Sequence, residues 1–336
     1  MRNNEEEGYE DCSDGSSDIS DDEIGDPNQN HDPGLTPLWV ASKDGVESEV
    51  KKLLERQDFD IERGCYGMTP LFTAILFNNP EVVEMLLRAG ADDSFIFSET
   101  KYTCLMLAVS MSPELDNRPY PHDELGQIHR QIWVVSHLLD NKKGNTSFVN
   151  MMGFEGKRPL DVVERVDIAE MLINAGADVN LSNPYDESTA LFGATKEMTK
   201  LLLARGANAT HKDFYGNDAL SCILQSGTDT QFVQMLLDAG VDINGGNKHG
   251  ITPLHRVGRW GNSVMAKFLL TKAVCFDVKD TSGGTPCNWT KLAGNTETLA
   301  LFETEILRRG RTAARDERAA KRDMRCAASH EMLGGN

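Results

Sequence analysis

The sequence lacks the segments that carry a chain into or across a membrane. Its 336 residues contain no run of 18 apolar residues, and no cationic start followed by an apolar stretch. Such stretches are what secretion signals and membrane-spanning helices require. The sequence therefore predicts no membrane partner.

Paired cysteines are also absent. The seven cysteines are odd in number and scattered, and no two form a C-x-x-C pair. This usage is typical of a chain kept in a reducing compartment, and it gives a zinc site little support. We expect free, mostly buried thiols and a location in the cytoplasm, or alternatively in the nucleus.

The motifs that mark common active sites are missing as well. No G-x-x-x-x-G-K-[ST] loop, no G-x-G-x-x-G after a strand, no H-E-x-x-H and no G-x-S-x-G occurs in the chain. The sequence thus predicts that the protein is not an enzyme. It also predicts no cofactor, no metal site and no small-molecule substrate.

Basic residues are few, with 34 Lys and Arg against 52 Asp and Glu, for a net charge of -18. This balance argues against nucleic-acid binding, which needs a positive face. The charge is uneven: residues 1–32 hold 12 acidic residues and one Arg, whereas residues 308–336 hold 8 basic and 4 acidic residues. The net charge therefore changes sign along the chain, from an acidic N-terminal start to a basic C-terminal tail.

The acidic start has no apolar periodicity, so residues 1–31 are predicted to be a disordered tail. Its serines lie among Asp and Glu, in a context that resembles acidophilic kinase sites: Ser13, Ser16, Ser17 and Ser20. The basic C-terminal tail, residues 306–336, is predicted to be a helix and tail, because residues 299–324 have a helix-forming composition. It could pair with the acidic tail, pair with an acidic partner, or remain a solvated face.

A block of about 33 residues recurs between these two ends. One copy reads Gly67-Met-Thr-Pro-Leu71, followed by Val82-Val-Glu-Met-Leu-Leu-Arg-Ala-Gly-Ala-Asp92. The Thr position recurs at residues 36, 69, 103, 158, 189, 218, 252 and 285. Such a period is the signature of a stacked repeat architecture.

Each part of the block has a physical reading. The Thr can cap a helix by accepting a backbone N–H, and the following Pro suits the first helical position. The V-x-x-L-L stripe gives a second helix an apolar face, and Gly90, Gly176, Gly206 and Gly240 follow its last turn. A single hairpin cannot bury these faces, so the units must stack.

These motifs resemble the ankyrin repeat, G-x-T-P-L-H followed by V-x-x-L-L-x-x-G-A-D-V-N. The resemblance covers residues 32–305 in about eight repeats and implies an all-α solenoid of helical hairpins with projecting loops. His255 occupies the His of the motif, where we expect it to tie neighbouring hairpins together by hydrogen bonds. Repeats four and five are short by a few residues, which predicts a shortened helix in each. Repeat three carries an insertion near 111–128 that its prolines predict to be non-helical.

Ankyrin-like arrays generally bind proteins through loop tips and the inner face of the first helices. The positions that face outward there hold eight of the chain's 23 aromatic residues, where chance would place about three. Large amphipathic rings on such a face favour partner binding. The alternative is that some rings pack between adjacent loops. The predicted partner-binding residues are Tyr66, Met68, Phe77, Tyr102, Phe154, Tyr185, Phe214, Tyr215, Ile251 and Trp260.

Two asparagines carry a further resemblance. Asn180 and Asn244 end L-x5-D-[VI]-N segments similar to those that an asparaginyl hydroxylase modifies in ankyrin proteins. They are candidate hydroxylation sites. Alternatively, each amide belongs to the repeat and holds its loop.

The resemblance and the motif search together predict a non-catalytic adaptor or scaffold that binds another protein. The alternative is a structural subunit permanently incorporated in a larger assembly. The sequence leaves the partner unidentified, because a repeat pattern does not encode its ligand.

Overall fold

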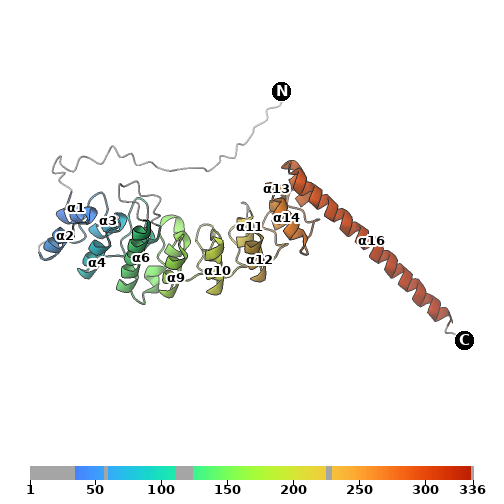
Figure 1. Ribbon diagram of the computed structural model, residues 1–336, viewed down its shortest axis with the longest axis horizontal. Helices are drawn as coiled ribbons and strands as arrows, with labels where there is room; N and C mark the ends of the chain where they lie inside the picture. The colour runs from blue at the N-terminus through green and yellow to red at the C-terminus, as the bar shows by residue number, and fades with distance from the viewer. Residues whose placement is uncertain (1–34, 57–59, 111–123, 225–228, 334–336) are drawn as a thin grey trace, which may run out of the picture.

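The structure, a computed structural model, describes residues 35–56, 60–110, 124–224 and 229–333. In these ranges the chain is a row of stacked helical hairpins, followed by one long helix (Figure 1). The described ranges contain isolated bridges between Cys65 and Met68 and between Ile96 and Thr103, but no strand. The predicted all-α class is confirmed. The predicted acidic tail, with its four serines, lies outside the described residues.

The hairpins follow the predicted order of helices. The first helices are α1 (Pro37–Asp44), α3 (Pro70–Leu76), α5 (Cys104–Ser110), α8 (Pro159–Val162), α11 (Ala219–Ile223), α13 (Pro253–Trp260) and α15 (Pro286–Leu292). The second helices are α2 (Glu47–Leu54), α4 (Pro80–Arg88), α6 (Glu124–Asn141), α9 (Val166–Asn174), α10 (Lys196–Ala204), α12 (Thr230–Asp238) and α14 (Ser263–Leu270). A short α7 (Thr146–Val149), a 3-10 turn η3 (Phe154–Gly156) and the final α16 (Thr296–Leu333) complete the chain.

Local chemistry sets both ends of these helices. Thr36 and Thr69 cap α1 and α3, each hydroxyl accepting a backbone N–H three residues on at 3.2 Å. A proline follows each cap at the first helical position. The four predicted glycines after the second helices have φ between 87° and 101°, the left-handed conformation that ends a helix most cheaply in glycine.

The two short repeats lose helix, as predicted. In repeat four α8 is a single turn, Pro159–Val162, and in repeat five residues 189–195 form turns rather than a helix. The interval between helices there is too short for a full first helix. The central repeats of the array therefore contain less helix than the repeats on either side.

The insertion in repeat three needs a partial correction. Residues 111–123 lie outside the described residues, but residues 124–128 are the first turns of α6, so the non-helical prediction is wrong for them. All three prolines of the segment precede Glu124, and in 124–128 only Gly126 is a poor helix former.

One apolar core runs the length of the array, from Leu38 to Phe302. Its two ends are held by first helices that pack on one another, as α1 on α3 and α13 on α15. The start of α16 closes the far end: Phe302 is fully buried, with its ring centroid 5.8 Å from that of Phe276. Residues 299–324, predicted to be helical, all lie in α16, which extends beyond the last hairpin (Figure 1).

Candidate functional site

The predicted partner-binding residues fall into two groups. Six of the rings are at least 42% exposed, with Tyr185 the most open at 75%: Tyr66, Phe154, Tyr185, Phe214, Tyr215 and Trp260. We call these six the aromatic face. The remaining four, Met68, Phe77, Tyr102 and Ile251, are half-buried. The loops and first helices thus present rings to solvent, as the positional reading expected, but not at every predicted position.

Some rings also pack between adjacent loops, as the alternative reading expected. Tyr102 stacks on Phe154 of the next repeat, with ring centroids 6.3 Å apart, and Tyr66 meets the buried Trp39 edge-on at 5.9 Å. These contacts cover one side of each ring and leave the other to solvent. A ring held in this way is already ordered before a partner binds, which lowers the entropic cost of association.

Backbone hydrogen bonds hold the loops of the later repeats in register. Phe214 N–H donates to the Asp186 carbonyl at 2.7 Å, and Lys248 N–H donates to the Tyr215 carbonyl at 2.9 Å. Thr281 N–H donates to the His249 carbonyl, also at 2.9 Å. The loop tips therefore form a connected edge rather than independent projections.

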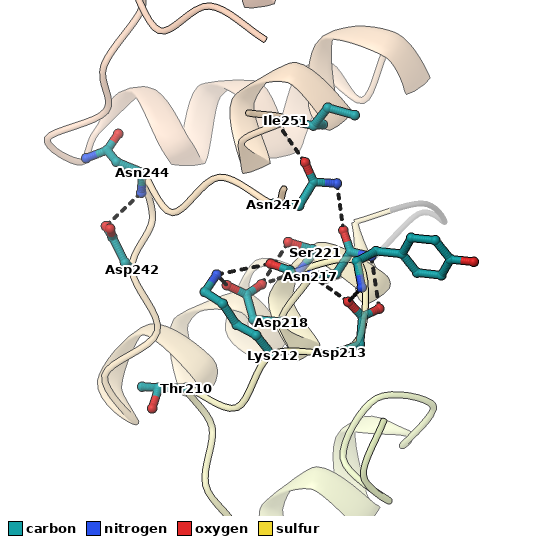
Figure 2. A network of polar contacts seen from close by, with 12 residues as sticks. Thr210, Lys212, Asp213, Asn217, Asp218, Ser221, Asp242, Asn244, Asn247 and Ile251 are labelled. Carbon is teal, nitrogen blue, oxygen red and sulfur yellow. Dashed lines mark hydrogen bonds and ion pairs between the residues drawn. The ribbon is translucent and has the colours of Figure 1, made fainter. Parts of the chain in front are cut away.

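Side chains inside each loop strengthen this edge (Figure 2). One Asp213 oxygen accepts the N–H groups of Tyr215 and Asn217 at 2.9 and 2.7 Å, and the other accepts the Asn217 amide. Asn247 of the next repeat then donates to the Asn217 amide oxygen at 3.0 Å (Figure 2). The aromatic tip at Phe214 and Tyr215 is fixed from within and from its neighbour.

His255 ties two hairpins together, as the resemblance implied. It is fully buried, and its Nδ1 accepts the Thr252 backbone N–H at 3.1 Å. Since that amide can only donate, the proton of the neutral ring lies on Nε2, which donates to the Gly284 carbonyl of the next repeat at 3.1 Å. Burial lowers the pKa of His255, against the opposing effects of the Gly284 carbonyl and Asp280. The ring is a structural bridge.

Cations also lie among these rings, a feature that the aromatic pattern of the sequence did not predict. Lys248 places its ammonium 4.5 Å from the ring centroid of Phe214, and the Arg259 guanidinium lies 5.7 Å from that of Trp289. Both distances fit cation–π contacts. Lys248 and Arg259 occupy positions that the ankyrin resemblance places on the outward-facing surface. Their positions in the repeat could therefore have indicated cations on this surface.

The two candidate hydroxylation sites hold neighbouring repeats together. The Asn180 amide donates to the Gly206 carbonyl at 3.0 Å and accepts the Asn208 N–H at 2.8 Å. The Asn244 amide, seen in Figure 2, bonds in the same way to the Ala273 carbonyl and the Cys275 N–H. The loop-holding role is therefore filled, and hydroxylation stays a prediction.

Thr210 occupies the same position in repeat five and cannot span to the next repeat (Figure 2). We expect Thr210→Asn to stabilise the array by about 1 kcal/mol, because an amide there reaches the Gly240 carbonyl and the Asp242 N–H. Urea unfolding measures the gain, and Thr210→Val, of equal size but without an amide, should show none. An Asn variant no more stable than the Val variant would contradict this bridge.

The described residues offer no metal site and no spanning helix. No group of three or more His, Cys, Asp or Glu side chains in those ranges could hold a metal ion, and no described helix is both long and apolar enough to cross a bilayer. A hollow of about 730 Å³ lies between the last loop and α16, with Phe276, Ile306 and Arg309 in its lining. It is separate from the aromatic face.

The family of the chain follows from its repeats. A family model described as ankyrin repeats (3 copies) matches residues 18–95 and 188–282, together more than half of the chain. The chain belongs to the ankyrin-repeat family. Ankyrin repeats generally mediate protein–protein interaction, so the stacked hairpins described above are an ankyrin-repeat solenoid of a kind that binds other proteins.

Curated relatives match this chain over only part of their own length. The B-cell lymphoma 3 protein homolog of Mus musculus is 24% identical over 233 residues, which are 66% of this chain and 47% of that protein. The E3 ubiquitin-protein ligase KEG of Arabidopsis thaliana is 23% identical over 289 residues, 76% of this chain but 18% of that protein. The chain spans less than half the length of the first curated relatives it matches.

Among solved structures, the ankyrin repeat domain of Bcl-3 aligns with a TM-score of 0.47 and 18% identity. The alignment covers 80% of this chain and 99% of that domain.

Proposed function

We propose that the protein is a non-catalytic adaptor or scaffold of the cytoplasm or nucleus. In this proposal it binds a partner protein through the aromatic face and the inner side of its first helices. Four of the ten predicted residues, Met68, Phe77, Tyr102 and Ile251, are half-buried, so we expect them to contribute less to binding than the exposed rings.

The exposed rings are the observation that carries this proposal. Tyr66, Tyr185, Tyr215 and Trp260 are each more than half exposed, so folding leaves most of each side chain in contact with water. Tyr and Trp are enriched among the residues that dominate binding energy at interfaces, because they bury much area at a low entropic cost. A partner is what would cover these rings.

Tyr66 lies in a loop conformation that Lys101, Glu155 and Glu187 also adopt. Its φ is 52°, in the left-handed region that a residue with a Cβ adopts only at a cost of about 1 kcal/mol or more. Glycine or asparagine would serve the turn better. One side of the Tyr66 ring packs on Trp39 and the side chain stays 63% exposed, so in this proposal a partner covers the open side.

The test is a double truncation of the aromatic face. We expect Tyr215→Ala with Trp260→Ala to weaken partner capture at least tenfold, since two such anchors contribute about 2 kcal/mol or more. Affinity capture with quantitative mass spectrometry compares this variant with the wild type and with Val264→Ala. Val264 is the matched control, because it is 66% exposed but lies on the second helix α14.

Circular dichroism must show that both variants keep the wild-type helix content. If the double variant captures the same proteins in the same amounts as the Val264→Ala control, the aromatic face is not the binding surface.

The alternative is a structural subunit permanently built into a larger assembly. Apolar side chains exposed outside the aromatic face favour it: Leu292 at the end of α15 is 88% exposed and Leu307 on α16 is 62% exposed. Size-exclusion chromatography with light scattering on native extract separates the two functions. A permanent subunit would never elute at the mass of the free chain.

A further inference from the structure

The inner surface of the array changes its charge along the chain. In repeats one to five, the loops and first helices carry six cations and eight carboxylates (residues 35–45, 62–78, 95–110, 152–165 and 181–195). In the last three repeats they carry six cations and three carboxylates (residues 211–224, 245–261 and 278–293). We call the cations of these last three repeats the basic end: Lys212, Lys248, Arg256, Arg259, Lys279 and Lys291.

The three carboxylates among them are occupied within their own loops. Asp213 accepts three N–H groups, as described above, and Asp280 accepts the N–H groups of two loop residues and the indole N–H of Trp289. Asp218 is buried, caps α11 through Ser221, and lies 3.6 Å from Lys212. None of the three is exposed. These three carboxylates therefore offset little of the positive charge that the exposed cations present to solvent.

Most cations of the basic end have no carboxylate partner. In the described ranges, no ion pair involves Lys248, Arg259 or Lys291, all of which are exposed. On α16, Arg308 and Arg309 are both paired with Glu305. The described inner surface of repeats six to eight, in contrast to that pair, carries exposed cations without a carboxylate partner.

Arg256 is a half-buried cation of this surface that keeps one unpaired donor. Its Nη2 donates to the Asn217 amide oxygen at 2.7 Å, while its buried Nε has no hydrogen-bond partner. Burial lowers the pKa of this guanidinium, and Cys222, Asp218 and Asp213 partly oppose the effect. A buried cation that keeps an unpaired donor gains from an anion brought to the surface above it.

We propose that the acidic segment of this same chain, residues 1–32, binds the basic end of the array. That segment carries 12 carboxylates and one Arg, the densest negative charge in the sequence. It also carries Tyr9, whose ring can pack on the rings of Tyr215 and Trp260. Charge complementarity of this kind guides association and selects the partner surface.

The length of the segment is sufficient. The 34 residues before Leu35 span at most about 110 Å when extended. Six steps of about 10 Å, the packing distance of neighbouring helices, separate α1 from α13, which is about 60 Å. About 18 residues cover that distance, so the carboxylates before residue 15 are the ones that reach the basic end: Glu5, Glu6, Glu7, Glu10, Asp11 and Asp14.

This contact makes the acidic segment a competitor for part of the aromatic face. A partner must displace it from repeats six to eight, while Tyr66 and Phe154 stay open. The contact itself does not depend on any partner, so it can be tested on the isolated protein whether or not the adaptor function holds.

The experiment is zero-length carbodiimide cross-linking of the full chain, which joins a carboxylate to a lysine amine in contact with it. Mass spectrometry should find Glu5–Glu10 joined to Lys248 and Lys291, and about 0.5 M salt should suppress these products because it screens surface charges. A mixture of ¹⁵N-labelled and unlabelled protein identifies them as intramolecular.

A charge reversal that spares both amines supplies the matched variant. In Arg259→Glu with Lys279→Glu the surface loses four charge units, and cross-links to Lys248 and Lys291 should fall about fivefold or more. Lys51→Glu with Lys52→Glu on α2 is the control and should leave them unchanged. Melting curves confirm that both proteins fold.

Three results would overturn the proposal. Cross-links spread evenly over Lys51, Lys52 and Lys200 would show that the segment has no preferred surface, and cross-links concentrated on Lys321 would place it on the basic helix. Products that are only intermolecular would assign the contact to a second copy of the chain.

Discussion

His255→Ala is expected to destabilise the C-terminal repeats by about 3 kcal/mol. The substitution removes a fully buried ring, leaves a cavity in its place, and strands the Thr252 N–H and the Gly284 carbonyl without their partners. The cavity and the two unsatisfied groups each cost about 1–3 kcal/mol. Hydrogen exchange of α13 and α15 amides measures the loss where it occurs. His249→Ala is the control, because His249 is exposed on the adjoining loop.

The same histidine makes stability depend on pH in a definite direction. Burial lowers its pKa in the folded protein, so the unfolded chain, with a pKa of about 6.5, binds the proton more readily. The contribution is fully present above about pH 6.5 and is lost as pH falls towards the folded pKa, by at most about 1.4 kcal/mol per pH unit. Protonation places a charge in a buried site, and a protonated Nδ1 could no longer accept the Thr252 N–H.

Urea unfolding at pH 7.5 and pH 5.5 tests this linkage. The difference in unfolding free energy between the two pH values should shrink in His255→Ala relative to the wild type. If the variant keeps the full difference, the titrating group lies elsewhere.

The second large effect is expected at Gly258 in α13. A Cβ added there would lie 2.3 Å from Thr290 Oγ1 and 2.9 Å from the Pro286 carbonyl oxygen, both on α15. The backbone atom cannot move without shifting α15, so Gly258→Ala forces α13 and α15 apart. We expect a net loss of about 2 kcal/mol, the cost of overpacking less the gain in helix propensity.

Gly310→Ala is the matched control for that variant. Gly310 lies in α16, has no neighbour within 4 Å of an added Cβ, and does not have a positive φ. The same substitution should therefore stabilise by up to about 1 kcal/mol through helix propensity alone. If both variants shift the melting temperature in the same direction, the close approach of α13 to α15 is not what Gly258 permits.

Because α15 carries Trp289 and α13 carries Arg259 and Trp260, the Gly258 variant also bears on the proposed site. Separating these helices would break the contact between the Arg259 guanidinium and the Trp289 ring. We expect partner capture to fall together with stability in Gly258→Ala, whereas in the Tyr215 and Trp260 double variant it should fall alone.

The local features of the fold could be predicted from the sequence. Thr36 and Thr69 start helices because a hydroxyl caps an N–H three residues away, and Gly90 and Gly176 end them because glycine alone tolerates their conformation cheaply. These interactions span a few residues, so the chain specifies them directly. The spacing of about 33 residues then fixed the stack, since no hairpin can bury its faces alone.

The tertiary structure decided which residues reach solvent and which charges meet. Trp39 is buried and Tyr102 half-buried because rings of the next repeat cover them, whereas Tyr185 stays open. Lys248 lies over Phe214, 34 residues earlier, only because loops of consecutive repeats are joined by backbone hydrogen bonds. Exposure and charge pairing depend on side chains about 30 residues apart, so they follow from the stacking of hairpins rather than from the pattern of any one repeat.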